Sequence, residues 1–80
     1  MSSIKDYINI DPEIQNGQPV FKGTRVPIET LFHHLENGVA LNEFLEDFPT
    51  VSRTQAVGVL GIAEKIMTSK NIEMLYETAA

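Results

Sequence analysis

Residues 10–28 read IDPEIQNGQPVFKGTRVPI, and this stretch decides how the N-terminal third of the 80-residue chain is expected to fold. It contains turn-forming residues of several kinds, namely Pro12, Gly17, Pro19 and Gly23. The prolines lack a backbone N–H, and the glycines accept a positive φ, so both kinds interrupt regular structure. The stretch therefore predicts short extended segments joined by turns, ahead of a helical remainder.

The predicted extended segments form a β-ribbon. Residues 7–10 alternate between apolar and polar side chains, as in a short strand, and Val20-Phe21 is a second candidate strand. Asn16-Gly17 between them suits a tight turn with positive φ. Pro12 and Pro19 favour edge positions. Because two short strands are not stable alone in water, we expect the ribbon to pair with the same ribbon of a second subunit.

The first of three predicted helices follows Pro27, which suits the first helical position. Its apolar residues recur at intervals of three and four, which makes one stripe on the helix, and Asn37-Gly38 ends it. The stripe consists of Ile28, Leu31, Phe32 and Leu35. A second helix follows Ala40, which offers no side-chain cap, and stops at Pro49. Its apolar residues are Leu41, Phe44, Leu45 and Phe48.

The third predicted helix begins at Ser52, where Ser52 and Gln55 match a capping box. Gly58 and Gly61 inside it either allow another helix or a backbone segment to approach closely or are tolerated weak positions. Its predicted buried stripe contains Ala56, Val59, Leu60, Ala63, Ile66 and Met67. The tail after Ser69 is a fourth short helix, a dimer contact or a docking segment.

These patterns predict one domain over residues 1–80, mainly α with a short N-terminal β-ribbon. The β-ribbon segment occupies residues 1–26, and a three-helix core occupies residues 27–69. Residues 41–69 have the proportions of a helix-turn-helix, and residues 70–80 form the tail. The fold is expected to be a homodimer through the ribbon.

The net charge of −5 is concentrated in the middle of the chain. Acidic and basic residues balance in residues 1–28 and again in residues 51–80, whereas residues 29–50 contain no lysine or arginine. The unbalanced acidic residues are Glu29, Glu36, Glu43, Glu46 and Asp47. Glu43, Glu46 and Asp47 are either a surface for a basic protein partner or a solvated face that keeps the chain soluble.

Several classes of function are not expected. The chain has no cysteine, so it can form neither a disulfide nor a thiolate metal site. His33 and His34 are adjacent in a helix and point in different directions, which disfavours a shared metal. No nucleophile–base pair or phosphate-binding glycine loop is recognisable. We therefore expect no enzyme activity, metal or cofactor. Because the sequence has no apolar run that could span a bilayer, we also expect a cytoplasmic protein without a membrane partner.

Nucleic-acid binding is a candidate because Arg53, Thr54 and Gln55 begin the second helix of the predicted helix-turn-helix. Arginine can recognise guanine, and glutamine can recognise adenine. Lys22 and Arg25 could contact phosphates, although the acidic residues nearby oppose such contacts. Arg25 could instead form an internal ion pair with Asp11 or Glu29.

The chain resembles a family of small prokaryotic proteins, the domain of unknown function 433. The family motif has the form D-P-x-I-x-x-G-x-P-x-I-x-G-T-R-I-P, followed by a helix that ends in x-G and by an acidic block before a proline. The resemblance extends from about Ile8 to Ala63. The matching motif residues are Asp11, Pro12, Ile14, Gly17, Pro19, Gly23, Thr24, Arg25 and Pro27, with Asn37-Gly38 and Leu45–Pro49 after them.

This resemblance implies a VapB-type antitoxin of a toxin–antitoxin system, with a helix-turn-helix-like domain. It also implies a homodimer that binds a nuclease-like toxin of the PIN class and its own operator DNA. The chain departs from the family at Ala40, where serine is usual, and at Thr54 and Gln55, where acidic residues are common. Two interpretations stay open, a DNA-binding antitoxin and a protein-interaction module that does not bind DNA.

Overall fold

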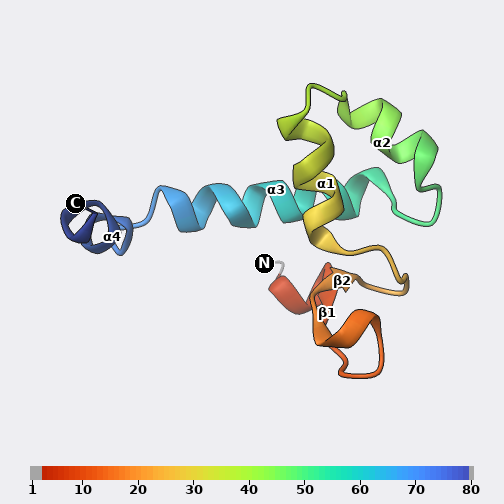
Figure 1. The fold of residues 1–80 in the computed structure, drawn as a ribbon, viewed down its shortest axis with the longest axis horizontal. Coiled ribbons are helices and arrows are strands. Elements are labelled where there is room, and N and C mark those ends of the chain that lie inside the picture. Colours follow the sequence, from red (N-terminus) through yellow and green to blue (C-terminus); the bar gives the residue numbers. More distant parts are fainter. Residues whose placement is uncertain (1–2, 80) are drawn as a thin grey trace.

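Four α-helices and a two-stranded ribbon make up the protein in a computed structural model that describes residues 3–79 (Figure 1). The described residues exclude Met1 and Ser2, at the start of the predicted β-ribbon segment, and Ala80, at the end of the predicted tail. The elements are η1 (Ile4–Asp6), β1 (Ile8–Asn9), η2 (Gln15–Gly17), β2 (Val20–Phe21), α1 (Ile28–Glu36), α2 (Leu41–Asp47), α3 (Arg53–Met67) and α4 (Ile72–Thr78). No helix among residues 3–79 is both long enough and apolar enough to span a bilayer.

The predicted ribbon is confirmed. Strands β1 and β2 pair antiparallel, with Ile8 opposite Phe21 and Asn9 opposite Val20. Positive φ angles at Gln15, Asn16 and Gly17 turn the connecting chain, and Asn16-Gly17 was the predicted position. Glutamine and asparagine adopt such angles at some cost, which glycine avoids. The connection thus brings two short strands together although it is longer than a two-residue hairpin loop.

The Gly23-Thr24-Arg25 sequence forms the turn that leads from β2 into α1. Gly23 has a φ of +79°. The Thr24 hydroxyl donates a hydrogen bond to the Phe21 carbonyl at 2.8 Å and accepts one from the Val26 N–H at 3.0 Å. These bonds satisfy backbone groups in a partly buried turn, where unpaired groups would cost about 1–3 kcal/mol each. Thr24 therefore fixes the angle at which the chain enters α1.

Pro27 lies one position earlier than predicted. It precedes α1 as the N-cap, with an extended ψ of 142°, and bridges to Val20. The Ile28 N–H donates to the Pro19 carbonyl at 3.0 Å. Because residue 27 continues the extended pairing of the ribbon, the first helical turn begins only at Ile28. The prediction that Pro27 occupies the first helical position is wrong for this reason.

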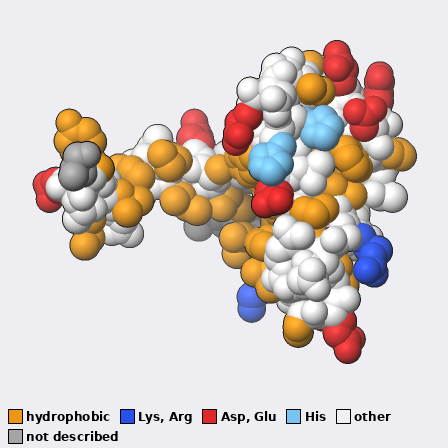
Figure 2. All heavy atoms as spheres, in the orientation of Figure 1, with side chains coloured by type: hydrophobic (Ala, Val, Ile, Leu, Met, Phe, Trp, Pro, Cys, Tyr) orange, Lys and Arg blue, Asp and Glu red, His pale blue; other side chains and the backbone are white. Residues whose placement is uncertain are grey.

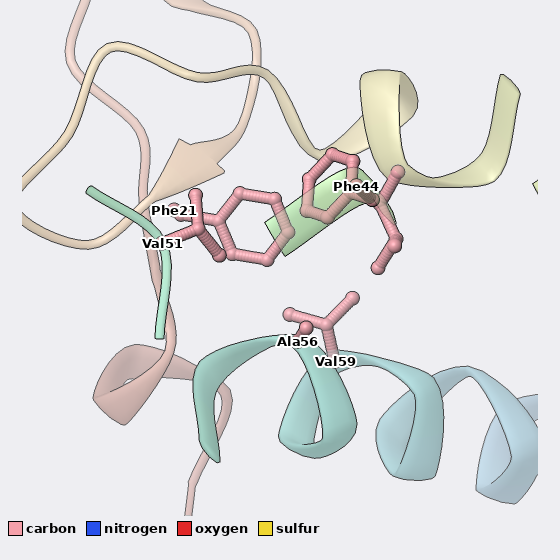
Figure 3. Close-up of a cluster of buried hydrophobic side chains, with 6 residues drawn as sticks. Phe21, Phe44, Val51, Ala56 and Val59 are labelled. Carbon is pink, nitrogen blue, oxygen red and sulfur yellow. The ribbon is translucent and has the colours of Figure 1, made fainter. Parts of the chain in front are cut away.

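The core lies between the ribbon, α1, α2 and the first half of α3. Ala56 and Val59 point from α3 toward the rings of Phe21 and Phe44 (Figure 3). The two ring centroids are 6.0 Å apart. The buried cluster consists of Phe21, Leu31, Phe44, Val51, Ala56 and Val59. The ribbon thus packs against helices of its own chain.

Tyr7 packs directly on α3 at Gly58. A Cβ atom at position 58 would lie 2.5 Å from two ring carbons of Tyr7, closer than carbon atoms approach. Only glycine leaves room for the ring at this point. Gly61 has open space beside it. Of the two helical glycines, Gly58 therefore allows a close approach, by the Tyr7 side chain and not by the helix or backbone that was predicted, and Gly61 allows none.

His34 connects α1 to α2. Its Nδ1 donates to the Thr30 carbonyl at 2.8 Å, and its Nε2 lies 3.9 Å from an Asp47 carboxylate oxygen. The ring also meets Phe44 and Phe48 edge-on, with centroids 5.3 and 5.5 Å away. Edge-to-face contacts of this kind contribute about 0.5–1.5 kcal/mol beyond burial. His34 is thus a packing residue between the two helices.

The two predicted ends of α2 and the predicted start of α3 agree with the structure. Ala40 precedes α2 without a side-chain cap, and the helix ends at Asp47, before Pro49. At the start of α3, Ser52 Oγ accepts from the Gln55 N–H at 3.1 Å. The Gln55 side-chain oxygen accepts from the Ser52 N–H at 2.9 Å. The capping box is therefore complete and sets the start of α3.

The buried stripe predicted for α3 is present only in its first half. Ile66 and Met67 are 59% and 63% exposed, because the neighbouring elements cover the second half of the helix only in part. This half of α3 projects from the rest of the molecule and carries α4 at its end (Figure 1). Residues 62–78 are called the arm below. The structure therefore shows a fourth helix in the predicted tail, after the three predicted helices.

Candidate functional site

The start of α3 presents the residues that were predicted to contact DNA. Arg53 and Thr54 are exposed, and Gln55 is half-buried. Arg53 donates from Nη2 to the Asn42 side-chain oxygen on α2. Gln55 donates from Nε2 to the Lys22 carbonyl at 2.8 Å. Two of the three predicted base-reading side chains are therefore bonded to other parts of the same chain.

The hydrogen bond from the Gln55 side chain to the Lys22 carbonyl brings Lys22 next to the start of α3, although the two residues are far apart in sequence. The Lys22 N–H also donates to the Tyr7 carbonyl at 2.9 Å, which holds this part of the ribbon in place. A shallow depression of about 380 Å³ borders the same surface, lined by Tyr7, Arg53, Thr54, Val57 and Gly58. Lys22, Arg53 and Thr54 thus belong to one region of the surface.

Arg25 is exposed on the turn between β2 and α1. Within residues 3–79 it forms no salt bridge, so the internal ion pair with Asp11 or Glu29 is not present. The turn is held instead by the Thr24 hydroxyl and the positive φ of Gly23. Asp11 serves the ribbon in another way, because its side chain accepts from the Glu13 N–H at 2.9 Å. The guanidinium of Arg25 is therefore available to solvent.

Glu43, Glu46 and Asp47 form an acidic face on α2. All three are exposed, and their spacing of three and four residues places them on one side of the helix. Figure 2 shows acidic side chains gathered over the part of the molecule that contains α2. Within residues 3–79 none of the three forms a salt bridge with lysine or arginine, and Nε2 of His34 lies 3.9 Å from an Asp47 carboxylate oxygen. The negative potential of this face is thus not neutralised locally.

An apolar groove lies between α3 and the start of α1, and the sequence patterns did not predict it. Its volume is about 390 Å³. Its lining is hydrophobic apart from Gln18 and Glu29, and includes Ile4, Ile8, Ile28, Phe32, Ile62 and Ile66. The signal that could have revealed it is the length of the α3 stripe, which exceeds what the predicted neighbouring elements could cover.

A second apolar concavity, of about 350 Å³, lies where α3 meets α4. Ile62 and Ile66 line it as well as the groove, and Ile72 and Leu75 contribute from α4. Hydrophobic side chains therefore continue from the groove along the arm, as Figure 2 shows for the visible face. A patch of this kind on a small protein marks an interaction surface more often than a solvated one.

Similarity to a known protein family is found for residues 8–61 and not for the arm. No curated protein and no solved structure matches the chain. A family model described as "protein of unknown function (DUF433)" matches residues 8–61, which contain the ribbon, α1, α2 and the first half of α3. The match ends where the arm begins. Because it covers more than half of the 80 residues, the chain belongs to the DUF433 family of proteins of unknown function.

Proposed function

We propose that the protein is a homodimeric binding module of the antitoxin kind, which neutralises a PIN-class nuclease toxin and catalyses no reaction itself. The observation that carries this proposal is the exposed acidic face of Glu43, Glu46 and Asp47, which has no lysine or arginine partner among residues 3–79. A nuclease surface that handles RNA is commonly basic, so the two surfaces are complementary in charge. The family resemblance supplies the toxin as the partner.

The strength expected of these charges is limited. An exposed ion pair contributes only about 0.2–1 kcal/mol, and salt screens it. Complementary potentials mainly raise the association rate and select the partner. The acidic face is therefore expected to control how fast and how specifically the toxin binds, while apolar contacts supply the remainder of the affinity.

The first prediction concerns charge reversal of this face. Glu43→Lys, Glu46→Lys and Asp47→Lys together should weaken binding to the purified toxin encoded beside this protein by about tenfold to a hundredfold. The loss should appear mostly in the association rate and should shrink as salt is raised. Surface plasmon resonance at low and high ionic strength measures both effects.

The control variant carries Glu13→Lys and Glu36→Lys, which reverse exposed charges on the ribbon connection and on α1, outside both α2 and the arm. Toxin binding should change much less in this variant. Equal affinities of the wild-type protein and the α2 variant would exclude the acidic face as the docking surface. Far-UV circular dichroism confirms that both variants remain helical.

Operator DNA is a second candidate ligand. It is favoured by the Gln55 bond, which places Lys22 beside the exposed Arg53 and Thr54 at the start of α3. In a helix-turn-helix, this end of the second helix enters the major groove. Arg53 would have to exchange its bond to Asn42 for a base or a phosphate.

The second prediction follows from this candidate. Titration against the DNA upstream of the gene should show binding that weakens steeply with salt and is lost in Arg53→Ala. Lys70→Ala, which removes one positive charge far from α3's start, should retain most of the binding. If the dimer binds no upstream DNA at either salt concentration, the protein is an interaction module without a DNA ligand.

A further inference from the structure

We infer that the arm and the apolar groove form a homodimer interface, in which the arm of each subunit covers the groove of the other. This inference specifies the dimer that belongs to the proposed function, but it requires neither the toxin nor DNA. It differs from the predicted dimer through the ribbon, whose strands already pack on helices of their own chain.

The first argument is surface area. The chain exposes 5974 Å². A compact monomer of 8.9 kDa is expected to expose roughly 4,800 Å², so the excess is roughly 1,200 Å². A stable interface of standard size buries about 800 Å² on each partner. The surplus surface of one chain is therefore sufficient for such an interface.

The second argument is that the arm exposes several large apolar side chains. Met74 and Leu75 on α4 are 67% and 65% exposed, in addition to Ile66 and Met67 on α3. Helix α4 has seven residues, and a helix so short is marginal in water unless it packs against something. Within residues 3–79, α4 contributes no residue to the buried core. The arm thus needs a covering surface outside its own chain.

The third argument identifies a second copy as that surface. Ile62 and Ile66 line both the groove and the concavity between α3 and α4, so the two surfaces are continuous. A twofold axis near these residues would place each arm against the partner's groove and cover both surfaces at once. Such a contact uses the same patch on both subunits and closes after two, which is the commonest arrangement of soluble oligomers.

Charge complementarity supports the same arrangement. Glu29 is the one charged residue in the lining of the groove, and Lys65 is the one charged residue in the lining of the concavity on the arm. Both are exposed, and within residues 3–79 neither forms a salt bridge. When the arm of one subunit covers the groove of the other, the two charges are opposite in sign and can meet. Like charges at these positions would repel and weaken the pairing.

The test measures the mass of the full chain by sedimentation velocity over a range of concentrations, without any partner. The expected mass is about twice the chain mass of 8.9 kDa. Ile66→Glu should shift the equilibrium toward monomer by at least about tenfold, because a carboxylate would be buried in the interface. Val57→Glu, which makes the same change at an exposed position of α3 outside both concavities, should leave the dimer intact.

A charge exchange tests the pairing of the two surfaces. Glu29→Lys and Lys65→Glu should each weaken the dimer, and the double variant should recover most of the loss, because the opposite charges are restored. Lys22→Glu, at an exposed position that lines neither the groove nor the concavity, is the matched control and should have little effect. Since the chain has no cysteine, a mixture of Glu29→Cys and Lys65→Cys chains should also form disulfide-linked dimers under mild oxidation.

A monomer at all concentrations would overturn the inference. So would a dimer whose stability is unchanged by Ile66→Glu and Lys65→Glu, since its interface would then lie elsewhere. Toxin binding is measured in a separate assay. A dimer that does not bind the toxin would refute the proposed function alone, and a monomer that binds the toxin would refute the dimer alone.

Discussion

Phe44→Ala should lower the free energy of unfolding by about 3–5 kcal/mol, the usual cost of deleting a buried aromatic side chain. Phe44 is fully buried and lies at the centre of the core, where it contacts Phe21, His34 and Phe48. A domain of 80 residues is expected to have a total stability of only about 4–12 kcal/mol. The variant should therefore be partly or wholly unfolded at 37 °C. Urea denaturation followed by far-UV circular dichroism measures the change.

Phe48→Ala is the matched control for this prediction. It removes the same side chain from a half-buried position that also contacts His34. Its cost should be clearly smaller, because less apolar area is lost and the site can fill with solvent or relax. Protein concentration has to be the same in all measurements, since dimerisation would add to the apparent stability. Equal losses in the two variants would mean that Phe44 is not at the centre of the core.

Gly58→Ala should destabilise the protein by up to about 2 kcal/mol, although alanine is the better helix former. The helix would gain about 0.8–1.0 kcal/mol from the substitution. The new Cβ would lie 2.5 Å from the Tyr7 ring, however, and the ring would have to leave its position on α3. Overpacking of this kind costs about 1–3 kcal/mol. The ribbon would lose part of its contact with the helix, which tyrosine fluorescence and urea denaturation can follow.

Gly61→Ala provides the internal control in the same helix. The space beside Gly61 is open, so only the gain in helix propensity of about 0.8–1.0 kcal/mol should remain. The two variants should thus change stability in opposite directions. Tyr7→Ala should remove most of the penalty of Gly58→Ala, because the clash requires the ring. Stabilisation by both alanines would show that Tyr7 does not pack on Gly58.

The local features of the fold could be predicted because their causes lie within a few residues. The capping box of Ser52 and Gln55, the end of α1 at Asn37-Gly38 and the turn at Asn16-Gly17 depend on side chains and backbone angles that the sequence displays. Pro27 shows the limit of such signals. A proline is compatible with the N-cap and with the first helical position, and pairing with Val20 decided between them.

The candidate site could be predicted only in part. The sequence identified Arg53 and Gln55 by residue type and position, but their bonds to Asn42 and to the Lys22 carbonyl join segments that are distant in sequence. Likewise, Glu43, Glu46 and Asp47 could be recognised as an uncompensated acidic group, because charge is counted along the chain. Whether those residues were solvent-exposed and unpaired could be seen only in three dimensions.

By itself, the sequence determined the order of the two strands and the first three helices, most of the ends of these elements, the acidic character of α2 and membership of the family. These properties arise from local backbone preferences, hydrophobic periodicity and the spacing of motif residues. The tertiary structure alone decided that Tyr7 occupies the space at Gly58, that the second half of α3 is left uncovered, and that an apolar groove lies beside it. The physical reason is that an amphipathic stripe shows which face of a helix seeks cover, whereas the covering element depends on how the rest of the chain packs.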